Sequence, residues 1–305
     1  MKKLILLATF ISLAFFSCKD KEGDLNPNDS GTQNLASSTP ENRTVVLEEY
    51  TGVRCTYCPD GHRRAQSFAD AHPGKVILIN VHTGNYATPS PGWPDFTTNY
   101  GAALATKSGM GQPGTGYPGG SVSRNTFASE PTVTSYKMAA GAQYTLLNRG
   151  GWWNSTNSTS PAGDIILAKP APVNVGIKVK SYNEATREVK LMVELYFTET
   201  VSDGALLNVA LLESEVKGKQ IDAGVTNANY MHKHMLRDLL TGQWGESISA
   251  AECVKGNRVK KEYTYVIAAK DKNSVDINVA NCDFAAYVSS NTNNDIYNGK
   301  EISVK

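Results

Sequence analysis

The stretch that decides the fold is residues 44–59, which read TVVLEEYTGVRCTYCP. It begins with the β-branched and apolar residues typical of a strand, and its last proline starts a helix-like segment, 59–72. The following segment, 75–82 (KVILINVH), is apolar enough to be a strand buried on both faces, as in a parallel sheet. Strand, helix and strand in this order predict a βαβ unit.

Cys55 and Cys58 lie in this stretch between the strand and the helix. A sulfur at that place lies near unpaired helix N–H groups and the positive end of the helix dipole, which stabilise a thiolate. We therefore expect Cys55 to be a partly exposed attacking thiolate and Cys58 the more buried resolving thiol of a mixed-disulfide exchange. A zinc site would need two more ligands at matching spacing, so we expect no metal and no cofactor. The alternative is a structural disulfide without turnover.

This arrangement resembles the thioredoxin fold, and the resemblance implies roles for two further residues. Glu49, six residues before Cys55, matches the buried acid that helps proton transfer from the resolving cysteine. Pro118, which follows Tyr117 and precedes a short strand-like segment, matches the cis-proline that faces the disulfide. The Trp-Cys-Gly-Pro-Cys centre of thioredoxin is absent, so the substrate range and the strongly reducing role of thioredoxin are not implied.

Later motifs extend the resemblance to most of the chain after residue 43. The matching residues are Glu49-Tyr-Thr-Gly52, Cys55-x-x-Cys58-Pro59-x-Gly61, His232-Lys-His-Met-Leu-Arg237 and Leu240-Thr-Gly-Gln-Trp-Gly245. Together they are similar to the twenty-eight-kilodalton outer-membrane lipoprotein family of Bacteroidota. The resemblance implies a thioredoxin-like fold and an outer-membrane location more directly than it implies a reaction.

The N-terminus predicts export. Residues 1–17 have the layout of a signal peptide, with Lys2 and Lys3 before an apolar run that is too short to span a bilayer comfortably. The run ends at Ser17-Cys18, which resembles a lipobox, so we expect Cys18 to carry acyl chains such as palmitate. The alternative is a plain signal peptide cut elsewhere. Residues 18–42 are polar without an aromatic residue and predict a disordered tether, which leaves both the periplasmic face and the cell surface open.

The remaining chain divides by pattern into two parts. We predict a thioredoxin-like α/β domain over 43–151, including a helix over 129–149, and a linker rich in Ser, Thr, Asn and Pro over 152–172. Apolar residues alternate along several segments of 173–305, which predicts an all-β sandwich. Within it, 227–244 is expected to be a loop with a short helix.

Two more sets of residues carry hypotheses. Cys253 and Cys282 complete an even set of four cysteines in an exported chain, and this parity predicts a structural disulfide between them. His232 and His234 lie between Met231 and Met235, and soft ligands of this kind suit copper. The segment is isolated in the sequence, so copper handling is a weaker alternative.

The charge balance limits the partners. The formal net charge is +1, and removal of Lys2 and Lys3 with the signal peptide makes it −1, without the clustered basic surface of nucleic-acid binders. We expect the membrane as a partner through the lipid anchor, and exported proteins as substrates of a thiol–disulfide oxidoreductase. The alternative is a binding or adhesion lipoprotein that keeps the thioredoxin fold as a scaffold.

The lipid anchor is directly testable. The apolar run ending at Ser17-Cys18 predicts that mass spectrometry of the mature protein finds Cys18 as the first residue, bearing acyl chains. A Cys18→Ser variant should lose the acyl chains and appear in the soluble fraction. A mature N-terminus at another residue, or an unmodified Cys18, would contradict the prediction.

Overall fold

A nine-stranded mixed sheet is the centre of the fold, with the order β14-β13-β7-β10-β2-β1-β3-β4 and with β11 paired to β7. The computed structural model describes residues 34–138 and 143–305. The predicted signal peptide, Cys18 and the first part of the predicted tether lie outside these residues. The strands of the sheet are β1 (Val45–Thr51), β2 (Val76–His82), β3 (Gly119–Val122), β4 (Leu147–Asn148), β7 (Ala205–Glu213), β10 (Met235–Leu239), β11 (Glu246–Ile248), β13 (Cys282–Ser290) and β14 (Ile296–Ser303).

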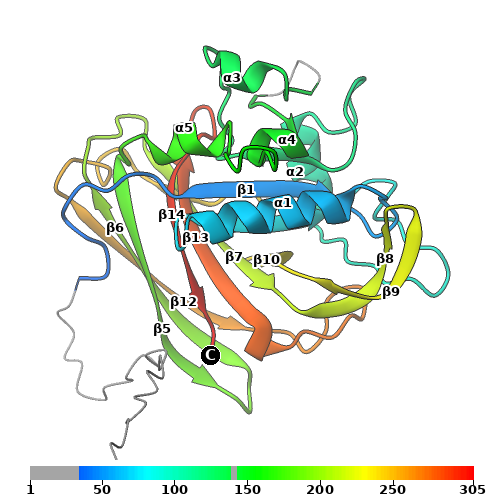
Figure 1. Cartoon of the computed structure of the whole chain (residues 1–305). Coiled ribbons are helices and arrows are strands. Elements are labelled where there is room, and N and C mark those ends of the chain that lie inside the picture. Colours follow the sequence, from blue (N-terminus) through cyan, green and yellow to red (C-terminus); the bar gives the residue numbers. More distant parts are fainter. Residues whose placement is uncertain (1–33, 139–142) are drawn as a thin grey trace, which may run out of the picture. The chain divides into compact units, whose positions relative to one another are not determined.

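Two smaller sheets and several short helices complete the described part of the chain (Figure 1). One sheet has the order β12-β6-β5 and the other is the β8–β9 hairpin. Their strands are β5 (Val173–Asn183), β6 (Glu188–Phe197), β8 (Val216–Asp222), β9 (Val225–His232) and β12 (Arg258–Val266). The helices are α1 (Cys58–Ala71), α2 (Gly101–Ser108), α3 (Pro131–Thr134), α4 (Arg149–Trp152), α5 (Gly163–Leu167) and the 3-10 turn η1 (Val279–Asn281). The chain is therefore mostly β, with few helices.

The predicted strand–helix–strand unit is present. β1 pairs in parallel with β2, from Val45 opposite Val76 onward, and every residue of both strands is buried. Between them α1 begins with a proline and an acidic residue in its first turn, both of which favour a helix N-terminus. Ala65 and Phe68 are buried on α1 and belong to one core cluster with Val45 and Leu47 of β1. This packing fixes the start of α1 next to the end of β1.

One sheet runs through both halves of the chain. Strand β10 pairs in parallel with β2 and antiparallel with β7, so it joins the βαβ unit to the later strands. One core cluster accordingly holds Val46 and Ile77 together with Leu212 and Leu236. The boundaries predicted at 151 and 172 do not coincide with a break in the sheet, and residues 34–305 form one compact unit. The division into separately folding domains stays a prediction.

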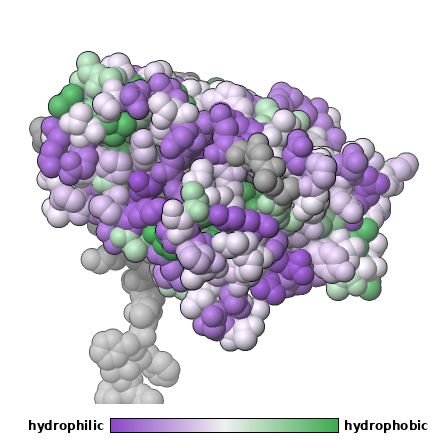
Figure 2. Space-filling view, turned by 90° about the horizontal axis from the view of Figure 1, so that it is seen from above, coloured by the Kyte–Doolittle hydropathy of each residue, from purple (hydrophilic) through white to green (hydrophobic). Residues whose placement is uncertain are grey.

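The three-stranded sheet of the second half packs on part of the nine-stranded sheet, and a separate all-β sandwich domain stays a prediction. The β12-β6-β5 sheet packs against β7 and β13, and their inward side chains form the largest core cluster. Leu191 and Val193 of β6 lie in this cluster with Val209 of β7 and Phe284 of β13. On the face shown in Figure 2, hydrophobic residues of the described part are scattered among hydrophilic ones, as on a surface in contact with water. None of the helices in the described part is long and apolar enough to cross a membrane.

Two predicted elements are wrong. The helix expected over 129–149 is limited to the four residues of α3, because the chain then turns back and donates from Met138 N to Leu146 O before it forms β4. The segment 227–244, expected to be a loop with a short helix, contains most of β9 and all of β10 instead. The hairpin turn is Ala223-Gly224, and both residues have positive φ, as in type I′ turns. Alanine at such a position gives little signal in the sequence.

The predicted tether ends earlier than residue 42. Ala36 is buried, and its N–H donates to Oε1 of the buried Glu194, at 3.2 Å. The side chain of Asn174 donates to the backbone carbonyls of Ser37 and Thr39. These residues are ordered against β5 and β6 because they supply hydrogen bonds that the buried polar side chains require.

A buried ion pair links β1 to the residues after β3. The Glu48 side chain accepts from Arg124 Nε at 2.9 Å and from Arg124 Nη2 at 2.6 Å, and Ser121 Oγ adds a third donor at 3.0 Å. Both charged side chains are almost fully buried. Each charge is therefore stabilised mainly by the other.

Removal of one partner should be costly. We expect Glu48→Ala to lower the free energy of unfolding by about 3–5 kcal/mol, because it leaves the Arg124 charge buried without a counter-ion. Chemical denaturation measures the loss. The exposed pair Lys255–Glu199 is the control, and Glu199→Ala should cost less than about 1 kcal/mol. Equal losses in the two variants would contradict the assigned role of the buried pair.

Candidate functional site

Cys55 and Cys58 are joined in a disulfide at the junction of β1 and α1, with their Cα atoms 5.4 Å apart. Residues 52–57 form the connection between the strand and the helix, and we call them the cysteine loop. The helix predicted over 59–72 begins one residue earlier, so that Cys58 is the first residue of α1. The pair therefore lies where helix N–H groups would stabilise a leaving thiolate.

The disulfide is closed off from solvent. Cys55 is 2% exposed and Cys58 is 0% exposed, so the expectation of a partly exposed Cys55 is wrong. The neighbouring Tyr57, in contrast, is among the most exposed large side chains of the described part. The loop is thus buried at Gly52, Val53 and Cys55 and reaches solvent at Tyr57.

The β8–β9 hairpin covers the cysteine loop. In Figure 1 it lies beside the N-terminal end of α1, coloured yellow. Ile221 N donates to Val53 O at 2.9 Å, and Ala223 N donates to Thr56 O at 3.1 Å. The buried side chain of Gln220 donates from Nε2 to the carbonyls of Gly52 and Cys55, at 3.3 and 3.0 Å. Four carbonyl groups of the loop are thus satisfied by a segment more than 160 positions later in the chain.

Two side-chain contacts hold the hairpin to α1. Asp222 accepts from Arg63 Nη1 and Nη2, at 3.0 and 3.3 Å. Tyr230 Oη lies 2.8 Å from His62 Nδ1, and Thr51 Oγ1 lies 3.0 Å from His62 Nε2. Burial lowers the pKa of His62 to about 4, and the neighbouring Arg63 adds to the effect, so the imidazole is neutral near pH 7.

Glu49 on β1 has a buried carboxyl that lies close to the first turn of α1. It is 0% exposed, and among the described residues neither of its oxygens has a hydrogen-bond partner. Its nearest cationic candidate is His62, whose Nε2 lies 3.6 Å from Oε1. Burial holds the pKa of Glu49 well above its usual value, and the charge of Asp60 raises it further. The protonated carboxyl is therefore favoured over a wider pH range than in an exposed glutamate.

Pro118 and Glu49 meet at Gly61. The Tyr117–Pro118 peptide bond is cis, as the resemblance implied. A Cβ atom on Gly61 would lie 2.5 Å from Glu49 Oε1 and 2.7 Å from Pro118 Cγ. Only glycine leaves room for this approach, one turn after Cys58. The structure therefore brings Glu49 and Pro118 together at the first turn of the helix that begins with Cys58.

The histidines of the Met-His-Lys-His-Met segment separate. His232 is buried beside His82 and Phe96, with ring centroids 5.4 Å and 4.7 Å away. Burial lowers the pKa of His232 to about 3. His234 lies at a different place and lines a cavity of about 270 Å³. In the described part of the chain, no group of three or more His, Cys, Asp or Glu residues could hold a metal ion. Whether the protein uses a metal stays untested.

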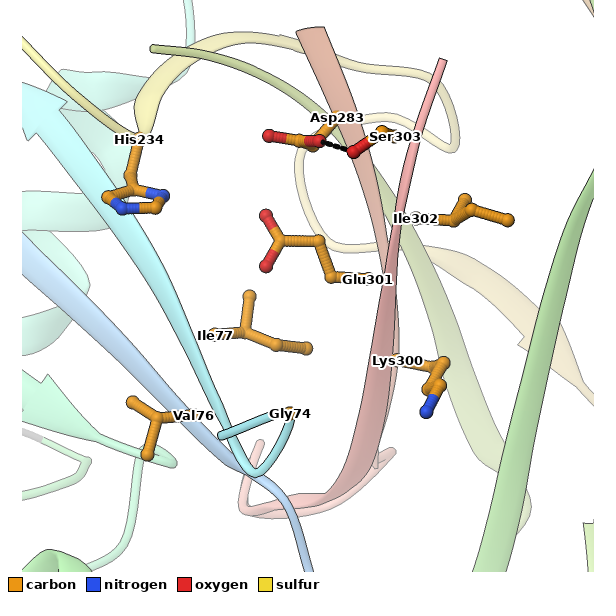
Figure 3. A pocket seen from close by; sticks show the side chains of 9 residues that line it. All are labelled: Gly74, Val76, Ile77, His234, Asp283, Lys300, Glu301, Ile302 and Ser303. Carbon is orange, nitrogen blue, oxygen red and sulfur yellow. Dashed lines mark hydrogen bonds between the residues drawn. The ribbon is translucent and has the colours of Figure 1, made fainter. Parts of the chain in front are cut away.

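The cavity that contains His234 is lined by strands β2, β13 and β14 (Figure 3). Glu301 points into it, and Asp283 accepts a hydrogen bond from Ser303 at its edge. Burial and then the charge of Asp283 raise the pKa of Glu301 to about 7. The complete lining is Gly74, Val76, Ile77, His234, Asp283, Lys300, Glu301, Ile302 and Ser303. None of these residues belongs to the cysteine loop or to the β8–β9 hairpin.

The disulfide predicted between Cys253 and Cys282 is not formed. Both are free, buried thiols in the described part of the chain. Cys253 Sγ lies 3.7 Å from Ile248 O and Cys282 Sγ lies 3.3 Å from Asn278 O, so each thiol donates to a carbonyl nearby in its own segment. Burial raises their pKa values to about 11 and about 12, which keeps both protonated. Cysteine parity carried no information about this geometry.

Several residues of the site were missed from the sequence. The hairpin folds over the cysteine loop and α1, and this brings Gln220 to the loop and Asp222 and Tyr230 to α1. Arg63 on α1 is the partner of Asp222. The one available signal was Asp222-Ala-Gly224, a turn-like tripeptide between two short polar strands. That signal gives a turn without saying where its tip docks.

The fold and the site define a mostly β protein with a mixed sheet and a disulfide at the start of a helix. Residues 128–305 match the model of the family described as Omp28, outer membrane protein. The chain belongs to this family, and its location is the outer membrane. None of the curated proteins matches the chain.

Solved structures with a similar fold have low sequence identity. HBP35 of Porphyromonas gingivalis is 17% identical, with a TM-score of 0.57 over 87% of this chain and 76% of that one. A structural-genomics protein from Agrobacterium tumefaciens is 11% identical, with a TM-score of 0.53 over 87% and 96% of the two chains. A domain of the outer membrane lipoprotein Omp28 from Porphyromonas gingivalis is 18% identical over 44% of this chain and 89% of that one, with a TM-score of 0.31. The first two likenesses concern the fold alone, and no conclusion is drawn from the third.

The raised pKa of Glu49 predicts a pH-dependent stability. Because the folded-state pKa lies above the unfolded value, the contribution of Glu49 is fully present below about pH 4.5 and is lost as the pH rises through the folded-state pKa. Glu49→Gln cannot ionise, so it should gain stability relative to the native protein above about pH 4.5, by up to about 1.4 kcal/mol for each unit of the shift. Denaturation at a series of pH values measures the difference.

The matched control for the replacement is the exposed Glu262, and Glu262→Gln should change the free energy of unfolding by less than about 1 kcal/mol. Burial lowers the pKa of His62, so its effect on stability has the opposite dependence on pH. His62 is present in both the native protein and the variant, so this effect is common to the two curves. A constant difference between Glu49→Gln and the native protein from pH 4 to pH 8 would contradict the assigned protonation.

Proposed function

We propose that the protein is a thioredoxin-like thiol–disulfide exchange protein of the outer membrane, with Cys55–Cys58 as its reactive pair and exported proteins as its substrates. The observation that carries the proposal is the buried, unpartnered carboxyl of Glu49 at the first turn of α1. A buried acid without hydrogen bonds is costly, so its presence against Gly61, in the turn of α1 that begins with Cys58, supports a chemical role. The cis Pro118 packed on Gly61 adds to the likeness with thioredoxin-fold sites.

The chemistry balances as a transfer of two electrons. A thiolate of the partner attacks Cys55 Sγ, a mixed disulfide forms, and the bond to Cys58 breaks. Cys58 leaves as a thiolate at the start of α1 and takes the proton of Glu49. A second thiolate of the partner then attacks the mixed disulfide, and Cys55 leaves and takes a proton from water. The partner becomes a disulfide and the pair a dithiol, which a second disulfide-bearing protein must reoxidise.

The roles of the two cysteines follow from their positions. Cys58 lies within α1 and is fully buried, so an incoming thiolate reaches it less easily than Cys55 in the loop. Glu49 would supply the proton to Cys58 and later recover it. Its carboxyl lies against Gly61, which is in the same turn of α1 as Cys58. The lipid anchor at Cys18, after a signal peptide of residues 1–17, would hold this site at the membrane surface.

One observation favours a second function. Cys55 is 2% exposed and its loop is tied down by the hairpin, as a structural disulfide would be. In this alternative the protein is a binding or adhesion lipoprotein, and the thioredoxin-like segment is only a scaffold. The two functions differ in whether Cys55 ever forms a mixed disulfide.

Trapping separates them. The full-length Cys58→Ser variant is reduced and mixed with a model protein that contains one accessible disulfide. Because the hydroxyl group introduced in place of the Cys58 thiol cannot resolve the intermediate, a stable mixed disulfide through Cys55 should accumulate and be visible on non-reducing gels. Cys55→Ser is the matched control and should form at most a tenth as much. Equal trapping by both variants, or none by either, would support the scaffold alternative.

A further inference from the structure

The contact between the hairpin and the cysteine loop is made by backbone groups. Ile221, in β8, and Ala223, the first residue of the hairpin turn, each donate a main-chain N–H to a loop carbonyl. The side-chain amide of Gln220 donates to the carbonyls of two further loop residues, Gly52 and Cys55. The end of the hairpin thus binds the loop partly through main-chain N–H groups, which the backbone of another peptide can also supply.

The two ends of the hairpin are attached by different kinds of contact. At its base, His232 is buried against Phe96, and Gly218 allows the close approach of both. Toward its tip the contacts are polar, and Val225 is 71% exposed. Among the described strands, β8 and β9 pair only with each other, so no ladder to the main sheet holds the tip. Movement about the base would break the tip contacts without disturbing the core.

We propose that the β8–β9 hairpin is a displaceable strap over the Cys55–Cys58 disulfide, and that an extended segment of a thiol-bearing partner protein replaces it on the cysteine loop. The inference rests on the proposed exchange function. It explains how a disulfide with 2% exposure at Cys55 can react: the loop opens only to a partner that restores its hydrogen bonds.

The chemistry of the loop defines the partner segment. When the strap lifts, the carbonyls of Val53 and Thr56 lose their donors, and unsatisfied polar groups near a buried disulfide are costly. The backbone of a partner segment can supply N–H groups to these carbonyls, as in β-strand addition. Loss of Asp222 also frees Arg63, whose side chain is 59% exposed even when paired. An acidic residue in the partner segment would pair with this guanidinium.

A charge-swap experiment tests the strap on the full-length oxidised protein. Asp222→Arg places like charges at the strap contact and should lift the tip. We expect dithiothreitol to reduce the disulfide about tenfold faster, as measured by alkylation of the free thiols and mass spectrometry. The amides of Ile221 and Ala223 should also exchange hydrogen faster. In the double variant Arg63→Glu/Asp222→Arg the pair is restored with its charges reversed, and both rates should return to within about twofold of the native values.

The control is Glu199→Lys, which reverses one charge of the exposed pair with Lys255 and should leave the rates unchanged. Unchanged rates in Asp222→Arg, or no recovery in the double variant, would overturn the strap. These measurements need no turnover, so they are independent of the trapping experiment. If the rates change as expected but Cys55 traps no partner, the exchange function is wrong. The hairpin then covers a structural disulfide.

A synthetic peptide tests the partner segment. The probe is residues 218–226 (GKQIDAGVT), added at millimolar concentration to the Asp222→Arg variant. It should slow reduction by dithiothreitol at least about threefold by occupying the freed carbonyls. The same peptide with N-methylated backbone at its isoleucine and its alanine lacks the two donors and should not protect. Equal effects of the two peptides would overturn the replacement of the strap by an extended segment.

Discussion

The position of β2 between β1 and β10 is the constraint on which the rest of the site depends. Parallel pairing with β1 brings the cysteine loop to the edge of the sheet where His82 ends β2. On its other side, Asn80 binds the carbonyls of Lys233 and His234, which directly precede β10. The chain that leaves the β8–β9 hairpin must therefore enter the sheet beside β2. Because of this connection, the hairpin lies over the cysteine loop.

Two features of the site oppose each other, and the hairpin reconciles them. The position of Cys58 at the start of α1 and the buried Glu49 are suited to exchange chemistry. The burial of Cys55 prevents it. A covering segment that binds by a few polar contacts at its tip can satisfy both, because the closed form protects the disulfide and the open form exposes it. Such a segment belongs to the low-stability part of a structure, whereas the core strands open only with global unfolding.

The sequence predicted what local patterns encode. The apolar runs of β1 and β2, with Pro59 between them, were sufficient for the strand–helix–strand unit and for the place of the disulfide. Prediction from the sequence failed where contacts between distant segments determine the structure. Hydrogen bonds between Ile221 and Val53, or between Ala36 and Glu194, leave no periodic signal in either segment. The pairing of Cys253 with Cys282 was inferred from parity, which ignores that each thiol finds a partner in its own segment.

The reduction potential of Cys55–Cys58 in the full-length protein tests the central claim most directly. Equilibration with redox buffers, followed by alkylation of free thiols, gives the fraction of the pair that is reduced at each potential. A pair that exchanges electrons with envelope proteins should have a potential between about −270 and −120 mV, the range of thioredoxin-fold oxidoreductases. A potential below about −300 mV is typical of structural disulfides and would contradict a reactive pair beneath the hairpin.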